Sequence, residues 1–346
     1  MRTPVAIPPE LLERISEYRR REGGLRRESL VEAIRSLSRM FTGERPLEAG
    51  YLSKRALRRA YVCYYLPVNY AKVRIVLREL KGFATLPKEP RVLDFGAGPG
   101  TASLAAADEL DHPRLTLVDV VDEALDDAEF LLNRPIERAA DPPSGPFDLI
   151  LAANVFGELP DPAPVRRLLD TALAPGGYLV VIDSALPTAA RRVMTWRDEL
   201  VAGGYRVAAP CLGAASCPMR RHGDLWCHQD LPWNPPKGQE ELDRELGFDK
   251  GSLKFSYLVV TREGAALQGP NRWRVVSNLH RSKGKAWAWL CGAKEELVRG
   301  ELLTRRRIPE FERARRGDVL EISPDPTGRF AEETRVRPVN TTFTER

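Results

Sequence analysis

The sequence of 346 residues is poor in cysteine and histidine, with 5 and 4 of them respectively. It has no apolar run near the roughly 18 residues of a membrane-spanning helix. Its N-terminus is rich in arginine but lacks an apolar signal-peptide core, and Glu10, Glu13 and Glu17 are atypical of a transit peptide. These absences argue against membrane and secreted proteins. We therefore expect a cytoplasmic monomer with no membrane partner, in which clustered cysteines bind a metal or do redox chemistry.

The net charge of +5 conceals a division along the chain. Residues 91–183 hold 6 basic and 17 acidic residues, a net charge of −11, so the flanking segments carry +16. Residues 1–60 alone hold 14 basic and 8 acidic residues. Basic flanks around an acidic centre favour a nucleic-acid partner, although solvated helix faces give the same composition.

Apolar spacing predicts the elements. Residues 8–40 repeat apolar side chains every three or four positions, which predicts two helices separated by Gly23 and Gly24. Residues 51–81 predict one or two further helices, interrupted at Pro67. From residue 90, short apolar strands alternate with helices, which predicts an α/β fold with a parallel, doubly wound sheet.

The C-terminal segments LKFSYLVVTR, RWRVVSN, KAWAWLCG, ELVRGELLTR and DVLEIS are strand-like, and the first of them is expected to complete the α/β sheet. The predicted organisation is a basic helical region (1–88), a Rossmann-like core (89–208), a cysteine-rich metal-binding insertion (209–236), remaining sheet strands with a β-rich C-terminal part (237–323), and a polar tail (324–346).

The stretch VLDFGAGPGTA places three glycines between a strand and a helix, where a side chain would keep the backbone away from a ligand. A carboxylate at the end of the next strand is suited to bind both ribose hydroxyls, and ligands bind outside the carboxyl ends of parallel strands. The candidate cofactor-binding residues are Asp94, Gly96, Gly98, Gly100, Thr101, Asp119, Asp141 and Asn154.

The spacing GxGxG differs from the GxGxxG typical of dinucleotide enzymes. It resembles the first motif of class I S-adenosylmethionine-dependent methyltransferases, and FDLILAANVFGELP and LAPGGYLVVID resemble their fourth- and fifth-strand motifs. The resemblance implies a class I methyltransferase fold with S-adenosylmethionine as cofactor.

Residues 209–230, APCLGAASCPMRRHGDLWCHQD, hold three of the five cysteines. Structural zinc sites usually use CxxC pairs, but here five residues separate Cys211 from Cys217 and nine separate Cys217 from Cys227. The wide spacing favours a larger centre such as an iron–sulfur cluster held by four thiolates, with zinc as the alternative. Cys291 is the candidate fourth ligand, His222 and His228 are possible substitutes, and Cys63 is expected to be a buried core residue.

The ordered motifs PC…CP…WCH, KFSYLVV and RSKGKAWAWLC, preceded by LPVNYAKVRIVLREL, resemble the mitochondrial small-ribosomal-subunit methyltransferase-like protein family and its bacterial relatives. The resemblance covers most of the chain. It implies that Cys211, Cys217, Cys227 and Cys291 hold a [4Fe–4S] cluster, and that the protein binds the small ribosomal subunit through its rRNA during assembly. Candidate phosphate contacts are the segments YRRR, GLRRES and LTRRRIPEFERARR. Trp226, Trp233, Trp287 and Trp289 are candidates for base stacking or for core packing.

The sequence does not identify a catalytic residue. Methyltransferases of exocyclic base amines commonly carry N/D-PP-Y/F after the fourth strand, where this chain reads NVFGELP. The leading hypothesis is therefore an rRNA-binding assembly factor of the small ribosomal subunit on a methyltransferase fold. An active rRNA or protein methyltransferase with a structural metal site is the alternative, and an iron or redox sensor is a third possibility.

Overall fold

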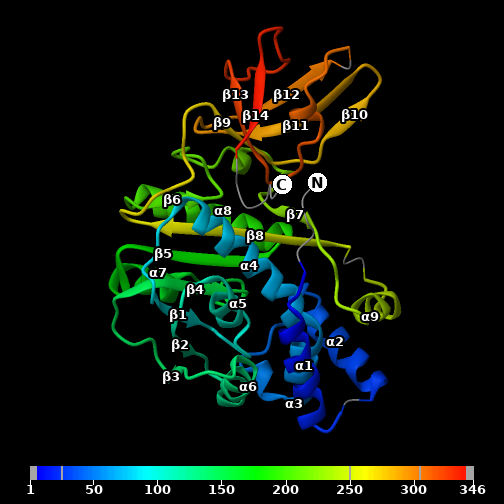
Figure 1. Cartoon of the computed structure of the whole chain (residues 1–346), viewed down its shortest axis with the longest axis vertical. Helices are drawn as coiled ribbons and strands as arrows, with labels where there is room; N and C mark the ends of the chain where they lie inside the picture. The colour runs from blue at the N-terminus through cyan, green and yellow to red at the C-terminus, as the bar shows by residue number, and fades with distance from the viewer. Residues whose placement is uncertain (1–5, 25, 249–250, 304, 340–346) are drawn as a thin grey trace.

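The computed structural model describes residues 6–24, 26–248, 251–303 and 305–339. Residues 1–5, 25, 249–250, 304 and 340–346, which fall in the predicted N-terminal region, C-terminal part and tail, lie outside the described residues. The N-terminal helices gather beside a large central sheet, and a second, smaller sheet lies at the other end of the molecule (Figure 1).

The N-terminal region is helical, as predicted. It contains α1 (Pro9–Arg21), α2 (Arg27–Phe41), α3 (Arg55–Ala60) and α4 (Leu66–Phe83). The predicted interruption at Pro67 is wrong, because the chain stays helical from α3 through a π-helical turn, Tyr61–Tyr65, into α4. Proline lacks an N–H but fits the first turn of a helix, and here Pro67 is the second residue of α4, just after the wider turn.

The central sheet has the order β3-β2-β1-β4-β5-β8-β6, and β7 pairs with β8. Its first five strands are parallel, whereas β8 is antiparallel to both β5 and β6. This is a doubly wound sheet with an antiparallel strand inserted near one edge, the arrangement of class I methyltransferases. The strands are β1 (Arg91–Phe95), β2 (Arg114–Val118), β3 (Glu137–Ala139), β4 (Phe147–Ala153), β5 (Leu173–Ser184), β6 (Arg206–Ala209), β7 (Gln229–Pro232) and β8 (Ser252–Thr261).

Both faces of this sheet are buried. Successive residues of β1 show the alternation, since Val92 packs in a core with the N-terminal helices and Leu93 packs in a second core. The first core also includes residues of α5 (Thr101–Glu109) and α6 (Asp122–Leu132), and the second includes residues of α7 (Ala163–Thr171) and α8 (Pro187–Ala202). The near-continuous apolar runs of the sequence follow from this two-sided burial.

After α9 (Gln239–Leu246) and β8, the chain forms a second sheet of order β10-β11-β9-β13-β14, with β12 paired to β11. Strand β14 lies in the predicted polar tail and pairs with β13, a pairing that the sequence did not indicate. The elements are β9 (Arg272–Val275), β10 (His280–Ser282), β11 (Lys285–Cys291), β12 (Leu297–Leu303), α10 (Pro309–Glu312), β13 (Val319–Ser323) and β14 (Arg335–Pro338).

A buried ion pair joins α4 to the second sheet. The Arg274 guanidinium, on β9, donates to Glu79 Oε1 of α4 at 2.8 Å, and the Tyr257 hydroxyl of β8 donates to the other oxygen of Glu79. Both partners of the ion pair are almost fully buried. Since an unpaired buried charge is costly, this contact favours a fixed position of the second sheet on the core.

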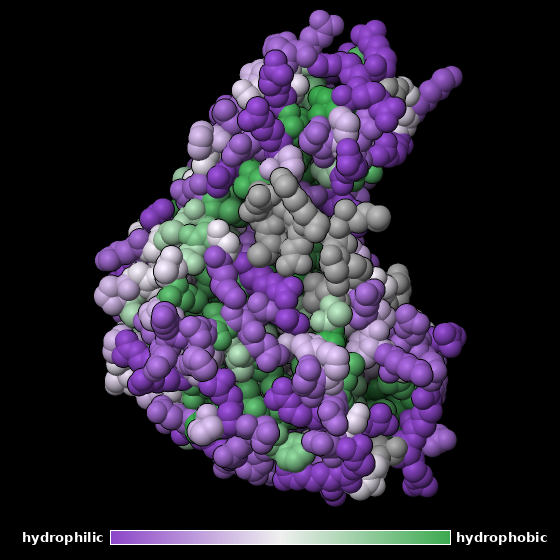
Figure 2. Space-filling model, in the orientation of Figure 1, coloured by the Kyte–Doolittle hydropathy of each residue, from purple (hydrophilic) through white to green (hydrophobic). Residues whose placement is uncertain are grey.

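None of the described helices is long and apolar enough to cross a membrane. The visible face of the part of the molecule that holds the second sheet is mainly hydrophilic (Figure 2).

Candidate cofactor crevice and cysteine centre

The glycine loop between β1 and α5 has the backbone conformation that only glycine adopts readily. Gly96, Gly98 and Gly100 have φ angles of +70°, +51° and +75°. A Cβ atom on Gly96 would lie 2.5 Å from Val155 Cγ2, and one on Gly100 would lie 2.9 Å from Ala128 Cβ. The loop therefore needs glycine for its conformation and for close packing against the neighbouring chain.

Asp119 follows β2 and faces this loop. Its Oδ2 accepts a hydrogen bond from the Gly98 N–H at 2.7 Å, and its Oδ1 accepts one from the Val121 N–H at 2.9 Å. Burial raises the pKa of Asp119, while these backbone hydrogen bonds oppose the rise. The Val120 N–H also donates to this carboxylate, which still has lone-pair capacity to accept from a hydroxyl of a ribose.

The next residue, Val120, is 87% exposed. Among the described residues it stands out as a large hydrophobic side chain that faces solvent. It stands at the carboxyl end of β2 beside the ribose candidate Asp119. An apolar side chain in this place fits the planar ring of a nucleoside, which would cover it.

The other predicted cofactor-binding residues differ in how deeply they are buried. Asp94 is buried at the end of β1 and accepts hydrogen bonds from Ser103 N–H at 2.9 Å and Ser103 Oγ at 2.6 Å, so it anchors α5. Burial raises the pKa of Asp94 to about 6. Thr101 begins α5 and is buried, and Asn154 follows β4 with a φ of +61°. Asp141 is exposed in the segment between β3 and β4.

An acidic group beyond β4 was not predicted from the sequence. The Tyr51 hydroxyl, in the turn before α3, donates to Glu158 Oε1 at 3.2 Å. Loss of hydration raises the pKa of Glu158 to about 8, the Tyr51 hydrogen bond opposes the rise, and the charges of Asp119 and Asp183 add to it. The GELP segment after the fourth strand was the available signal for Glu158. The sequence near Gly98 contains no signal for Leu52. Its side chain would lie 3.3 Å from a Cβ atom placed on Gly98.

All four predicted cysteine ligands line one cavity. Cys211 follows β6, Cys217 precedes a short helical turn at 218–221, Cys227 lies two residues before β7, and Cys291 ends β11. Each of the four is a free thiol. Cys63 lies outside this cavity; it packs against the core at the N-terminal helices, as expected, but it is partly rather than fully buried.

The thiols are close enough to influence one another. Burial raises the pKa of Cys217 to about 12 and that of Cys227 to about 11, and the charge of Cys211 adds to both rises. Burial also raises the pKa of Cys291, and the other three cysteines add to it. Two cationic side chains, Arg197 and Arg274, also line the cavity.

No set of three or more His, Cys, Asp or Glu side chains in the described residues is placed as the ligands of a metal ion. The predicted substitutes take other positions. His228 stacks on Trp226 with ring centroids 5.5 Å apart, and its pKa is lowered to about 4, mainly by burial. The His222 ring lies 6.1 Å from the ring of Trp289.

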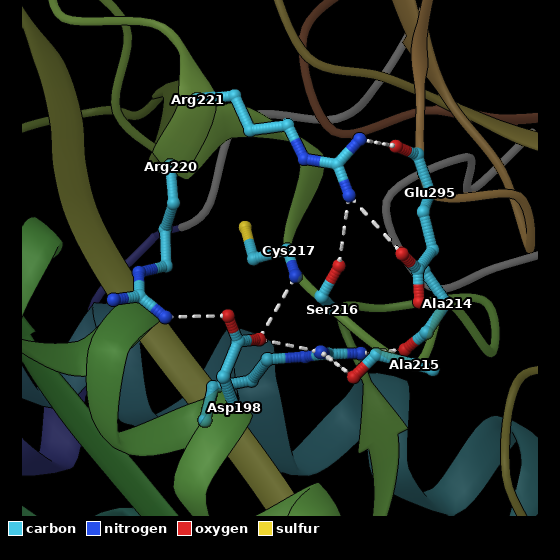
Figure 3. A network of polar contacts seen from close by, with 9 residues as sticks. Asp198, Ala214, Ala215, Ser216, Cys217, Arg220, Arg221 and Glu295 are labelled. Carbon is cyan, nitrogen blue, oxygen red and sulfur yellow. Dashed lines mark hydrogen bonds and ion pairs between the residues drawn. The ribbon is translucent and has the colours of Figure 1, made fainter.

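Helix α8 holds the cysteine loop through one carboxylate (Figure 3). Asp198 accepts hydrogen bonds from the Cys217 N–H at 2.8 Å, from Arg197 at 2.7 Å and from Arg220 at 2.7 Å. Arg197 also donates to the carbonyl oxygens of Ala214 and, at 3.0 Å, Ala215. The position of the loop is therefore set by the methyltransferase core.

The same loop reaches the second sheet. Arg221 donates to Ser216 Oγ at 3.4 Å and to Glu295 Oε2 at 3.1 Å, and Glu295 lies between β11 and β12 (Figure 3). The cysteine cavity consequently lies where the core, the loop and the second sheet meet. Its lining comes from all three.

Comparison with known proteins gives one family. A family profile described as "Mitochondrial small ribosomal subunit Rsm22" matches residues 55–320. No curated protein matches the chain.

Solved structures resemble only part of the chain. A putative methyltransferase from Bacillus halodurans has 15% identity and a TM-score of 0.36, over 56% of this chain and 98% of that one. A methyltransferase from Geobacter sulfurreducens in complex with S-adenosyl-L-homocysteine has 13% identity and a TM-score of 0.35, over 55% and 90%. A ribosomal protein L11 methylase from Lactobacillus delbrueckii has 15% identity and a TM-score of 0.34, over 56% and 79%. The fold assignment rests on the strand order rather than on these scores.

Proposed function

The chain belongs to the Rsm22 family of the mitochondrial small ribosomal subunit, and because of that membership we propose that it is an rRNA-binding assembly factor of the small subunit. It binds S-adenosylmethionine and holds a [4Fe–4S] cluster, and it acts as a cytoplasmic monomer. The observation that supports the cluster most strongly is that one cavity is lined by Cys211, Cys217, Cys227 and the distant Cys291.

The chemistry of the donors supports an iron–sulfur cluster, although the four thiols do not surround a single metal-ion position in the part of the chain that the structure describes. Four thiolates are the usual ligands of a [4Fe–4S] cluster, and such a centre with its ligands carries a net charge of about −2 in its oxidised form. Arg197 and Arg274 line the same cavity and place positive charge next to it, although each also pairs with a carboxylate, Asp198 and Glu79 respectively. Zinc with four thiolates has the same net charge, so the wide cysteine spacing is what favours the cluster.

When bound, the cluster supplies iron–thiolate bonds that cross-link the cysteine loop to β11. The chain itself prepares this link. Asp198 fixes the backbone at Cys217, and the Glu79–Arg274 pair holds β9 beside the end of β11. The structural role thus resembles that of other metals that join separate segments of a fold.

The crevice fits S-adenosylmethionine in its nucleoside part. Asp119 offers carboxylate lone pairs to ribose hydroxyls, exposed Val120 offers an apolar contact to the adenine ring, and the glycine loop lets the backbone approach. The cofactor brings a methyl group on a sulfonium centre, which a positioned nucleophile attacks when transfer occurs.

Exposed basic side chains support the rRNA partner. Arg305, Arg307, Arg313 and Arg315 are exposed in the C-terminal part, and Arg19, Arg20 and Arg21 are exposed at the end of α1. Such side chains contact phosphates and give affinity that falls as salt rises, with little choice of sequence.

A second candidate function, methyl transfer to rRNA or protein, is favoured by Glu158. Glu158 is exposed to solvent, yet its pKa is raised and its carboxylate accepts from Tyr51 close to Asp119. A perturbed carboxyl beside a candidate cofactor site is typical of a functional site. Transfer of labelled methyl from S-adenosylmethionine to small-subunit precursors, lost in Glu158→Gln, would support it. If no such precursor accepts methyl, the methyltransferase function is contradicted and the assembly-factor function remains.

Co-sedimentation tests the proposed function. The purified protein is expected to sediment with small-subunit particles and with their rRNA at low salt and to dissociate as salt is raised. Large subunits serve as the control particle. Failure to sediment with small subunits or free rRNA at low salt would contradict the proposal.

A further inference from the structure

Aromatic and cationic side chains share one face of the second sheet. Strand β11 alternates buried Ala286, Ala288 and Leu290 with partly exposed Lys285, Trp287, Trp289 and Cys291. Strands β10 and β12 both pair with β11, and they place His280 opposite Trp287 and Arg299 opposite Trp289. Side chains directly opposite in paired strands stand on the same face, so these residues form one surface.

Three planar groups on this surface are stacked. The His280 ring lies parallel to Trp287, with centroids 4.0 Å apart and planes at 15°. The Arg299 guanidinium carbon lies 4.3 Å from the centre of the Trp287 ring. His280 and Arg299 are themselves exposed. The stack therefore presents further planar faces to the solvent.

The row of aromatic side chains continues toward the cysteine cavity. Trp289 meets Trp287 edge to face at 6.2 Å and packs with Met194, Met219 and Val276 beside Cys291. The inner end of the row is thus fixed by packing. By contrast, Trp233 is buried and the Trp226 indole N–H donates to the Ala185 carbonyl at 2.8 Å, so these two tryptophans pack within the fold.

Positive charge exceeds negative charge on the surface. The Glu301 carboxylate is shared by Lys285 at 2.9 Å, Arg329 at 3.1 Å and Arg299 at 3.4 Å. One negative charge thus faces three positive ones. Lys283, in the turn between β10 and β11, is exposed and adds another. This excess matches a polyanion.

We propose that this surface, formed by His280, Trp287, Arg299 and Lys285, binds single-stranded RNA by stacking bases on the His280–Trp287–Arg299 stack. The inference rests on the proposed rRNA-binding function and specifies where and how an unpaired segment is held. Aromatic platforms with surrounding cations are typical of single-strand binding, because every base has a face to stack and every nucleotide a phosphate. In a duplex the base faces are covered by neighbouring base pairs. A duplex can therefore contact only the charged side chains of this surface.

Direct binding of a labelled single-stranded RNA of about a dozen nucleotides, of mixed sequence, tests the proposal on the full chain. His280→Ala is expected to raise Kd roughly tenfold, because it removes an exposed stacking ring without touching the core. His280→Tyr is expected to restore binding. Arg299→Lys keeps the charge but loses the planar group, and it is expected to weaken binding severalfold.

Arg335→Ala is the matched control, since Arg335 is exposed on β14 at the opposite edge of the same sheet. It is expected to change Kd by less than about twofold. A duplex of the same sequence is expected to bind more weakly and to be insensitive to His280→Ala.

The outcomes separate this inference from the proposed function. If wild-type protein binds RNA and His280→Ala leaves Kd unchanged, or affects single strand and duplex equally, the stacking surface is wrong and the rRNA role stands. If wild-type protein binds no RNA at low salt, the proposed function fails and the stacking surface fails with it.

Discussion

Loss of hydration raises the pKa of Asp94, Asp119 and Glu158, most clearly at Glu158, where it rises to about 8 although this residue is exposed at the surface. A raised carboxyl pKa means that the folded chain keeps a proton that the unfolded chain releases. Between the ordinary pKa of 4.5 and about 8, the unfolded state therefore binds fewer protons. Stability is then lost as pH rises through this window.

Glu158→Gln is expected to remove this loss. Relative to wild type, the variant should gain free energy of unfolding as pH rises from 5 to 8, because it has no carboxyl group to hold neutral. Since Glu158 is exposed, solvent screening keeps the gain below that of a fully buried carboxyl. Urea unfolding at both pH values, without cofactor, measures the difference. Parallel pH profiles for variant and wild type would contradict the assignment of a neutral Glu158.

Val120 allows a second prediction at the level of one residue. Val120→Ser should weaken binding of S-adenosylhomocysteine by roughly tenfold, since an apolar contact of valine size is lost. It should leave the unfolding midpoint unchanged, because the side chain is 87% exposed. Isothermal titration calorimetry and thermal melts give the two values. Unaltered affinity would show that the adenine ring lies elsewhere.

Among the elements, α8 connects the core of the central sheet to the cysteine loop. Its Val193 and Trp196 pack in the core under the central sheet, while Arg197 and Asp198 reach the cysteine loop. The loop between β6 and β7 has little regular structure of its own, so hydrogen bonds from this helix are what position Cys217.

Asp198→Ala should loosen that loop. Three hydrogen bonds are lost, one of them to the Cys217 N–H, so we expect roughly tenfold faster proteolysis within residues 211–228. Limited proteolysis with mass spectrometry locates the cuts. Asp224→Asn, at an exposed acid in the same loop, is the control and should leave the rate unchanged. Equal rates for both variants would rule out this anchoring role.

The sequence predicted elements whose signal is local. The glycine loop followed from its spacing, and β8 followed from LKFSYLVVTR, which does pair with β5. Cys291 was predicted as the fourth ligand because it is the cysteine that remains once Cys63 is assigned to the core; the structure places it in one cavity with the other three, and their role as metal ligands stays a prediction. Contacts between distant segments were not predictable, among them Tyr51 with Glu158 and Glu79 with Arg274. Each depends on packing that brings together residues more than 100 positions apart.

At the scale of the whole molecule, the contacts between the core and the second sheet in the described residues include the Glu79–Arg274 pair, the Arg221–Glu295 pair and the shared lining of the cysteine cavity. Arg274 of the first pair is on β9, and Cys291 of the cavity ends β11. The two residues pair with each other beside the aromatic row of the proposed RNA surface. The second sheet is consequently held in a fixed relation to the cofactor crevice.

Glu79→Ala tests the Glu79–Arg274 link. It leaves Arg274 buried without its carboxylate partner, and we expect the free energy of unfolding to fall by about 3–5 kcal/mol. Chemical denaturation measures the change. Glu89→Ala is the control, because Glu89 pairs with Arg114 on an exposed surface and its loss should change stability little. Equal effects of the two substitutions would contradict the role of the buried pair.

The most direct test of the account is the iron, sulfide and zinc content of the protein purified without oxygen. The account predicts about four irons and four sulfides per chain, a broad absorption band in the visible range, and loss of all of them in Cys291→Ser but not in Cys63→Ser. One zinc and no iron per chain, or a Cys291→Ser variant that keeps its full iron content, would contradict it.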